Sequence, residues 1–437
     1  MAQTQNELVP LYRRLPHGPS GMGKQEVQRN QRSRLYGAMI EAIAKTGYER
    51  TTVAHVITLA GVSRRAFYEI FTNKEDCFLG TYDIVVAQSR KRVLEAWSTE
   101  HGWENRMHAS CASLLGGIAR SPKGPHLVLV DSLGIGPRAR ERMQLAGLVF
   151  ERVVSTAFQM APEDVVFPQL TSRAVVSGVR HLIFLRMLER RQRELAGMAD
   201  EVLDWVEAYR VPPGTRLRTL SLAKPPHLPP SPAAFLTGDD KRARLLGSVV
   251  HLTLDEGYAG LTDPQIAQFA GVSTEAFHRQ FANKEECFLT VLDEFVEETL
   301  ECVRPATLNA DSWEQAVYQG IAAFVTHLVA HQALLRIAFI DLFEVGPAMV
   351  GRMTRSVADF TEMLTAAGPP PVRAPEIACE AVTGAVWGVI SSLVANNRLS
   401  RLPSLVDHLA FIVLAPYVGA RAAVEAVAAG NRAPVAA

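Results

Sequence analysis

The chain repeats itself at a fixed interval of 210 residues, and this repeat restricts the possible fold more than any other feature. Residues 47–79 read GYERTTVAHVITLAGVSRRAFYEIFTNKEDCFL, and residues 257–289 read GYAGLTDPQIAQFAGVSTEAFHRQFANKEECFL. The register continues beyond this block, since the Gly-Pro pair at 136–137 stands opposite the Gly-Pro pair at 346–347. A register that holds so far without a gap indicates two complete units in tandem.

Apolar residues recur at three- and four-residue spacing through most of the chain, which is the period of an α-helix. Signals for β-strands are nearly absent. The spacing predicts helices over Asn30–Thr46, Lys74–Trp97, Ala139–Ala161 and Ala174–Glu194. A chain of 437 residues is longer than one core usually fills, so the prediction is an all-α protein with several domains.

The most regular part of each repeat has the pattern of a helix-turn-helix, two short helices crossing at a tight turn. With Gly61 at the turn, Val56 and Phe67 fall where the two helices must pack together, and Ala60 is small where they cross. Ser63 is well placed to cap the second helix.

The second helix of this motif would carry the groups that read DNA. Arg64 and Arg65 lie in its first turn, and arginine binds guanine bidentately in the major groove. Tyr68 lies one turn further on, within reach of a phosphate or a thymine methyl group. Contacts to the DNA backbone are expected from Thr51, Thr52 and Lys74.

The pattern from Thr51 to Phe78 resembles the N-terminal domain of the TetR (tetracycline-repressor) family, and the second copy from Thr262 to Phe288 resembles it too. This resemblance implies a three-helix DNA-binding head followed by a helical ligand-binding and dimerisation domain. It implies operator DNA as a partner, a small-molecule effector, and repression as the usual outcome. The sequence signature covers the heads only, so the C-terminal domains are assigned by helical periodicity and position.

Seven prolines between Val211 and Gly238 exclude a helix there and predict an extended linker. The expected domains are a flexible basic arm at 1–23, a first helix-turn-helix domain at 24–73, a first effector and dimerisation domain at 74–210, the linker at 211–238, a second, divergent helix-turn-helix domain at 239–283, and a second effector and dimerisation domain at 284–430. Arg13 and Arg14 in the arm either enter a minor groove or form a solvated tail.

The two heads differ on the face that would meet DNA. Thr274, Glu275 and His278 replace the two arginines and the tyrosine, and residues 239–275 carry net charge −3 where residues 29–65 carry +5. Phosphate attraction dominates affinity for DNA, so the second head is expected to bind weakly or to serve as scaffold. Alternatively it reads a different half-site through Thr274, His278, Arg279 and Lys284.

Assembly has two possible forms. Family members dimerise through late helices, and the segments Ala174–Leu188 and Ala381–Ala395 are rich in small apolar residues. They would pair within one chain as an intramolecular pseudo-dimer, or between chains in a homodimer. The effector is expected to be apolar, but apolar residues at helical spacing are usually core, so the pocket residues stay unknown.

An enzyme is not expected. The sequence GPSGMGKQ at 18–25 imitates a phosphate-binding loop but lacks the Ser or Thr that holds magnesium. His327 and His331 lack the glutamate of a zinc protease motif, and the five cysteines form no CxxC pair. We expect no catalytic residue, metal or cofactor, no membrane partner and a cytoplasmic location. The alternative function is a ligand- or partner-binding regulator with reduced DNA binding.

Overall fold

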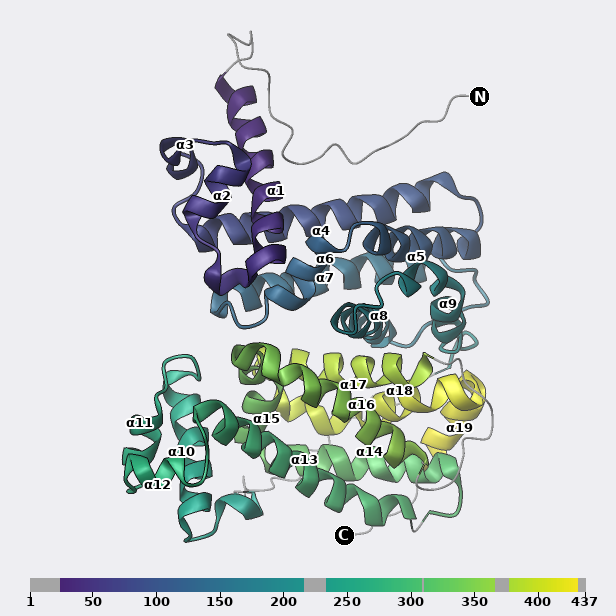
Figure 1. Ribbon diagram of the computed structural model, residues 1–437. Coiled ribbons are helices and arrows are strands. Elements are labelled where there is room, and N and C mark those ends of the chain that lie inside the picture. The colour runs from purple at the N-terminus through teal and green to yellow at the C-terminus, as the bar shows by residue number, and fades with distance from the viewer. Residues whose placement is uncertain (1–23, 216–232, 309, 366–376, 431–437) are drawn as a thin grey trace. The chain divides into compact units, whose positions relative to one another are not determined.

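The structure, a computed structural model, describes residues 24–215, 233–308, 310–365 and 377–430 (Figure 1). Within these ranges the chain forms helices and turns, and the single β-type pairing is a bridge between Val166 and Val211. The prediction of an all-α protein is confirmed. The basic arm predicted at 1–23 and residues 216–232 of the predicted proline-rich linker lie outside the described residues.

The first repeat contains nine described α-helices, and a 3-10 turn η2 (Glu194–Gly197) follows the eighth. They are α1 (Lys24–Arg50), α2 (Val53–Ala60), α3 (Arg64–Tyr68), α4 (Lys74–Thr99), α5 (Trp103–Arg120), α6 (Lys123–His126), α7 (Pro137–Gln159), α8 (Thr171–Leu188) and α9 (Ala199–Glu207).

The second repeat contains ten described α-helices. They are α10 (Lys241–Glu256), α11 (Asp263–Phe269), α12 (Thr274–His278), α13 (Lys284–Leu308), α14 (Trp313–Ala330), α15 (Gln332–Phe339), α16 (Met349–Thr365), α17 (Ala378–Ala395), α18 (Val406–Val418) and α19 (Ala420–Gly430).

The predicted helix Ala174–Glu194 is too long at its C-terminal end. Helix α8 ends at Leu188, and Arg190 then adopts φ 60°, a left-handed conformation that an α-helix does not contain. The apolar period alone did not reveal this stop because the residues that follow are charged and carry no Gly or Pro before Gly197. The start of the segment is confirmed, since Ala174 lies within α8.

The chain divides into two compact units that do not coincide with the two sequence repeats. Unit 1 holds the described residues up to Val149 together with Arg186–Ala199, and unit 2 holds Phe150–Leu185 and the described residues from Asp200 onward. Unit 1 therefore contains the first head, α4, α5 and η2. Unit 2 contains most of α8 and α9 together with the whole second repeat.

In unit 1 one apolar core joins the head to the helices that follow it. Leu35 and Met39 of α1, Phe67 of α3 and Phe78 of α4 are fully buried in this cluster. An exposed charged pair, Arg142 of α7 and Asp83 of α4, lies beside this core with 3.4 Å between Nη1 and Oδ2. Because α4 is continuous from the head into the helical domain, the head has a rigid connection to it.

Unit 2 has an apolar centre made by α17 and α18. Two segments, Ala378–Ala395 and Leu399–Val418, are long and apolar enough to cross a membrane by length and composition, as is the bent pair α14–α15 taken together. In the structure ten residues of α17 and eleven of the thirteen residues of α18 are buried. They pack against each other and against α14 and α15, and this packing accounts for their apolar character.

Helix α8 crosses α17 within unit 2 at very short range. A Cβ on Gly384 would overlap the side chain of His181, and one on Gly388 would overlap the side chain of Ser177. Near this crossing the Tyr209 hydroxyl donates to the Ile412 carbonyl of α18 at 3.0 Å. Glycine at 384 and 388 is therefore what allows the two helices to meet.

Candidate nucleic-acid interface

The first head forms a regular helix-turn-helix. Gly61 ends α2 with φ 58° and ψ 43°, a left-handed conformation that glycine adopts without strain. Thr52 caps α2 by accepting a hydrogen bond from the His55 amide at 3.2 Å, and Ser63 caps α3 by accepting one from the Ala66 amide at 3.1 Å. Both caps fix where the helices begin, and hence which residues form the first turn of α3.

The three expected base-reading residues lie together on the exposed face of α3. The side chain of Arg65 is 90% exposed and makes an i,i+4 ion pair with Glu69, with 3.0 Å between Nε and Oε1. The Arg64 guanidinium lies 5.9 Å from the centre of the Tyr68 ring, and both side chains are exposed. Exposed ion pairs of this kind are weak, so Arg65 is free to exchange its partner for DNA.

Thr51 and Lys74, two of the three expected phosphate contacts, face the protein instead. Thr51 is buried, and its hydroxyl donates to the Gly47 carbonyl at 2.7 Å. The Lys74 ammonium donates to the Tyr48 carbonyl at 3.0 Å and lies 4.0 Å from the centre of the Tyr48 ring. These contacts favour a structural role, the tying of α4 to the end of α1. Thr52 is the exposed member of the set.

Arg34 has a structural role in this head beyond its contribution to the net charge of residues 29–65. Its Nε donates to the Ala60 carbonyl at 2.8 Å, and its Nη2 donates to the Gly61 carbonyl at 2.6 Å. The side chain is buried, so α1 holds the carbonyl end of α2 and the turn itself. Its position four residues before Ala38, on the apolar face of α1, was the signal available in the sequence.

The second head has the same frame with a different surface. Gly271 adopts φ 66°, and Ser273 caps α12 by accepting from the Ala276 amide at 3.2 Å. On its outer face Thr274 is half-buried, whereas His278 and Arg279 are exposed. The His278 Nε2 lies 3.9 Å from the Asp263 Oδ2. The helix-turn-helix geometry is therefore kept while the basic groups are lost.

Lys284 makes more internal contacts than its counterpart Lys74. Its ammonium donates to the carbonyls of Tyr258, Ala259 and Leu261 at 3.2, 3.2 and 2.7 Å. An ammonium has three donors, so all of them are used. Burial lowers the pKa of Lys284 although Asp263 acts in the opposite direction. Its placement does not favour a contact with DNA.

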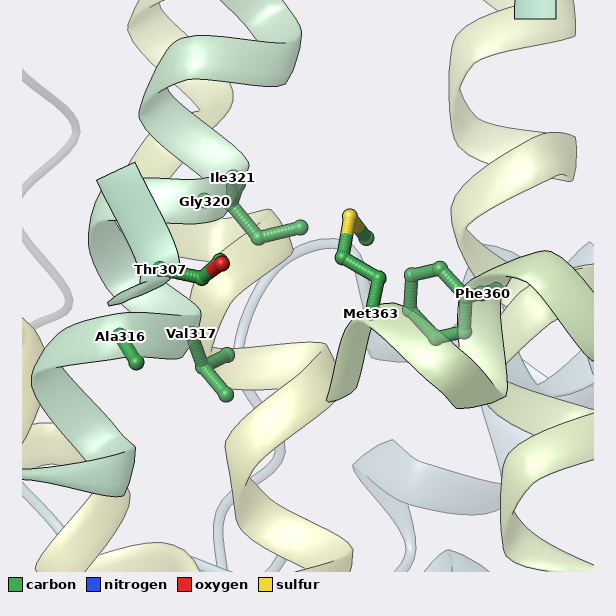
Figure 2. A pocket seen from close by; sticks show the side chains of 7 residues that line it. All are labelled: Thr307, Ala316, Val317, Gly320, Ile321, Phe360 and Met363. Atoms are coloured by element: carbon green, nitrogen blue, oxygen red, sulfur yellow. The ribbon is translucent and has the colours of Figure 1, made fainter. Parts of the chain in front are cut away.

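The helical part of the second repeat has a small, largely apolar hollow (Figure 2). Met363 and Phe360 from α16 face α14 across it, and Thr307 of α13 contributes a hydroxyl. The remaining lining is the apolar or bare surface of α14, formed by Ala316, Val317, Gly320 and Ile321. The sequence offered no signal for this pocket because its residue types are those of an ordinary core.

No group of three or more residues able to hold a metal ion occurs in the described part of the chain. Burial raises the pKa of the Cys77 and Cys287 thiols to about 12, so both stay neutral and pack as apolar side chains.

Two capped helix-turn-helix heads in a chain whose described residues are helical define a tandem helix-turn-helix protein. The family model for "Bacterial regulatory proteins, tetR family" matches both heads, at residues 37–81 and 250–291. Both heads of the chain therefore resemble the DNA-binding domain of that family.

The comparisons also found individual proteins that resemble parts of the chain. The HTH-type transcriptional activator FasR of Mycolicibacterium smegmatis is 24% identical over 156 residues, which are 36% of this chain and 61% of FasR. The chain thus matches about three fifths of that relative's length. Structures of the regulator FadR from Bacillus subtilis, in complex with stearoyl-CoA, and from Bacillus halodurans align with TM-scores of 0.35 and 0.36. Their identities are 15% and 17%, and each alignment covers 40% of this chain and 96% of the FadR chain.

Proposed function

We propose that the protein is a ligand-responsive transcriptional regulator whose first head reads an operator in the major groove. The observation that carries this proposal is the first turn of α3, where Arg64 and Arg65 project from a helix with a fixed start. The head around it has net charge +5 over residues 29–65. A basic, exposed and correctly phased helix meets the requirements for phosphate attraction and for guanine recognition together.

Base contacts are assigned to Arg64, Arg65 and Tyr68, and a phosphate contact to Thr52 at the start of α2. Ser63 acts through its cap, which sets the phase of the helix. Thr51 and Lys74 act through the packing of the head and not through DNA. The protein works where its operator is, in the cytoplasm.

The second head is proposed to bind DNA weakly or not at all and to be kept as a folded support. Its window carries net charge −3, and Glu275 stands where the first head has Arg65. Arg242, one of its few cations, is paired with Glu294 at 2.6 Å between Nη2 and Oε1. Of its four candidate contacts only Arg279 adds a free positive charge to the exposed face.

The crossing of α8 and α17 supports an intramolecular pseudo-dimer. Ser177 of α8 contacts Gly388 of α17, and His181 of α8 contacts Gly384 of α17. The second contact lies four residues later along α8 and four residues earlier along α17, so the two helices run in opposite directions. In the 210-residue register Gly388 corresponds to Gly178, the neighbour of Ser177. Two helices related by a two-fold axis perpendicular to them cross in this way, antiparallel and centred on equivalent residues.

Effector binding in a helical domain is proposed to move the heads, and the residues that bind the effector are not assigned. The sign of regulation needs its own test, since FasR is named as an activator whereas repression is the usual outcome in the family. A promoter–reporter assay with and without the protein gives it directly. Stearoyl-CoA serves there as one probe in an effector panel.

The test of the main proposal is selection of binding sites from random duplexes at low salt. It uses the wild type, Arg64→Ala with Arg65→Ala, and Thr274→Ala with Arg279→Ala. Loss of binding in the first double variant only, with a symmetric site, is the expected result. Loss in both variants with an asymmetric site gives the second head a reading role. No enriched sequence from the wild type would overturn DNA reading and favour the ligand- or partner-binding alternative.

A further inference from the structure

One face of α5 combines the groups that bind it to α4 with a bare stretch of backbone. Ser110 and Ser113 donate from this face to the Val93 and Arg92 carbonyls of α4, at 3.1 and 3.5 Å. Gly117 follows Ser113 by four residues and Arg120 follows Gly117 by three, so all four lie on the same side of the helix. Along this face the two serines are followed by Gly117, which has no side chain, and then by Arg120. The surface left bare by Gly117 and its neighbour Gly116 is called the glycine gap.

Two arginines occupy the glycine gap. A Cβ on Gly117 would lie 2.8 Å from Nη1 of Arg92, and one on Gly116 would lie 3.1 Å from Nη1 of Arg120. Gly116 and Gly117 are consecutive, and both are buried. Two guanidinium groups, one from α4 and one from α5, thus rest against adjacent residues of one helix.

Neither guanidinium has an anionic partner among the described residues, where no ion pair or hydrogen bond involves either group. Burial lowers the pKa of Arg92, and the positive charge of Arg120 lowers it further. Arg92 is partly buried whereas Arg120 is exposed, and a like charge beside a partly buried cation destabilises it unless an anion lies nearby. An anion bound between the two guanidinium groups would therefore stabilise the partly buried charge of Arg92.

We propose that Arg92 and Arg120 form a binding site for the phosphate group of a small-molecule effector. The guanidinium fork matches phosphate oxygens bidentately, and two forks suit a tetrahedral dianion. DNA is the less suitable source of phosphate because Arg92 lies eighteen residues after Lys74 along α4, about 27 Å from the head. The role as an effector site rests on the proposed function, whereas anion binding itself does not.

The second repeat provides an internal comparison. At the positions of Arg92, Gly116, Gly117 and Arg120 it has Cys302, Thr326, His327 and Ala330. Both cations and both glycines are absent there, so the site belongs to the first repeat alone. If both repeats bind effectors, the two effectors differ in charge.

The test is calorimetric titration of the full-length protein, without DNA, using inorganic phosphate and phenyl phosphate as probes. We expect saturable binding of at least one probe, and an affinity at least tenfold lower in Arg92→Gln and in Arg120→Gln. Arg92→Lys keeps the charge but loses the fork, so it is expected to bind more weakly than the wild type while remaining folded. Arg90→Gln, an exposed arginine of the same helix, is the control and should bind as the wild type does.

The pattern of probes identifies the source of the phosphate. Binding of both probes indicates the phosphate group alone as the ligand, and binding of phenyl phosphate only indicates an organic ester. Absence of saturable binding, or equal binding by wild type and Arg92→Gln, overturns the site. So does a loss of operator affinity in Arg92→Gln when no small molecule is present, which would make the arginines DNA contacts. Phosphate binding by a protein that selects no DNA would instead defeat the proposed function and leave the site intact.

Discussion

Arg34 and Arg64 lie thirty residues apart in a head that the sequence marks as basic, yet they serve different purposes. Arg34 is buried and donates to two carbonyls at the turn, whereas Arg64 is exposed on α3. A count of charges treats them alike, because it contains no information on direction. The same holds for Thr51 and Thr52, neighbours of which one is buried and the other exposed.

Replacing Arg34 by Met should lower the free energy of unfolding of the first head by about 2 to 3 kcal/mol. The change leaves the Ala60 and Gly61 carbonyls without a charged donor, and hydrogen bonds to charged groups are worth about 1.5–3 kcal/mol. Chemical denaturation followed by circular dichroism measures it. Arg32→Met, at an exposed position of the same helix, is the control and should change stability by less than about 0.5 kcal/mol. Equal effects of both changes would contradict a stabilising role for the hydrogen bonds that Arg34 donates to the Ala60 and Gly61 carbonyls.

Stability should fall as the pH is lowered from about 6.5 towards 4, in part because of His181. Burial, with a smaller effect of Arg180, lowers the pKa of His181 to about 4. His181 is therefore protonated more easily in the unfolded chain than in the folded one. Its contribution to the free energy of unfolding is fully present above the unfolded pKa and is lost as the pH falls towards the folded pKa. A shift of this size corresponds to about 3 kcal/mol.

The measurement is the free energy of unfolding at a series of pH values for wild type, His181→Gln and His251→Gln. His181→Gln should have the shallower dependence, and the exposed His251→Gln should follow the wild type. His327, whose pKa burial lowers to about 4, remains in all three proteins, so only the difference between slopes is attributed to His181. Parallel slopes in the three proteins would refute the assignment.

At the scale of elements, the sequence predicted helices more reliably than it predicted their ends and contacts. The helix-turn-helix was predictable because one glycine, two caps and a few apolar residues at fixed spacing determine it locally. The end of α8 and the inward direction of Lys74 were not, since each depends on residues distant in sequence or on a charged segment without a helix stop signal. The Arg92–Arg120 pair was hidden for the same reason, as it joins two helices.

Gly388→Ala should weaken the crossing of α8 and α17. The new methyl group would overlap the side chain of Ser177, so the helices must separate or Ser177 must move, at a cost of about 1–3 kcal/mol. Thermal unfolding with scanning calorimetry measures the loss. Gly351→Ala in α16 is the matched control, because a Cβ there meets nothing within 4 Å. That change should be neutral or slightly stabilising, since alanine favours a helix more than glycine does.

For the whole molecule, the different charges of the two heads determine how many chains an operator needs. With one reading head per chain, a palindromic site should bind two chains, which light scattering of the protein–DNA complex measures as mass. Changing Thr274→Arg together with Glu275→Arg should give the second head groove-facing cations and allow one chain to occupy two half-sites. Thr99→Arg with Glu100→Arg adds the same charge at exposed positions where α4 ends and should leave two chains bound. One wild-type chain per palindrome would contradict this account.

The contact between Gly388 and Ser177 is made inside a single polypeptide. In a regulator assembled from separate subunits, the amount of paired protein falls steeply when few copies are present, because pairing depends on the square of the monomer concentration. A covalent connection replaces that requirement with a fixed local concentration, which does not change on dilution. The paired helices of this chain therefore form at the same rate and to the same extent in a cell that holds very few molecules of it.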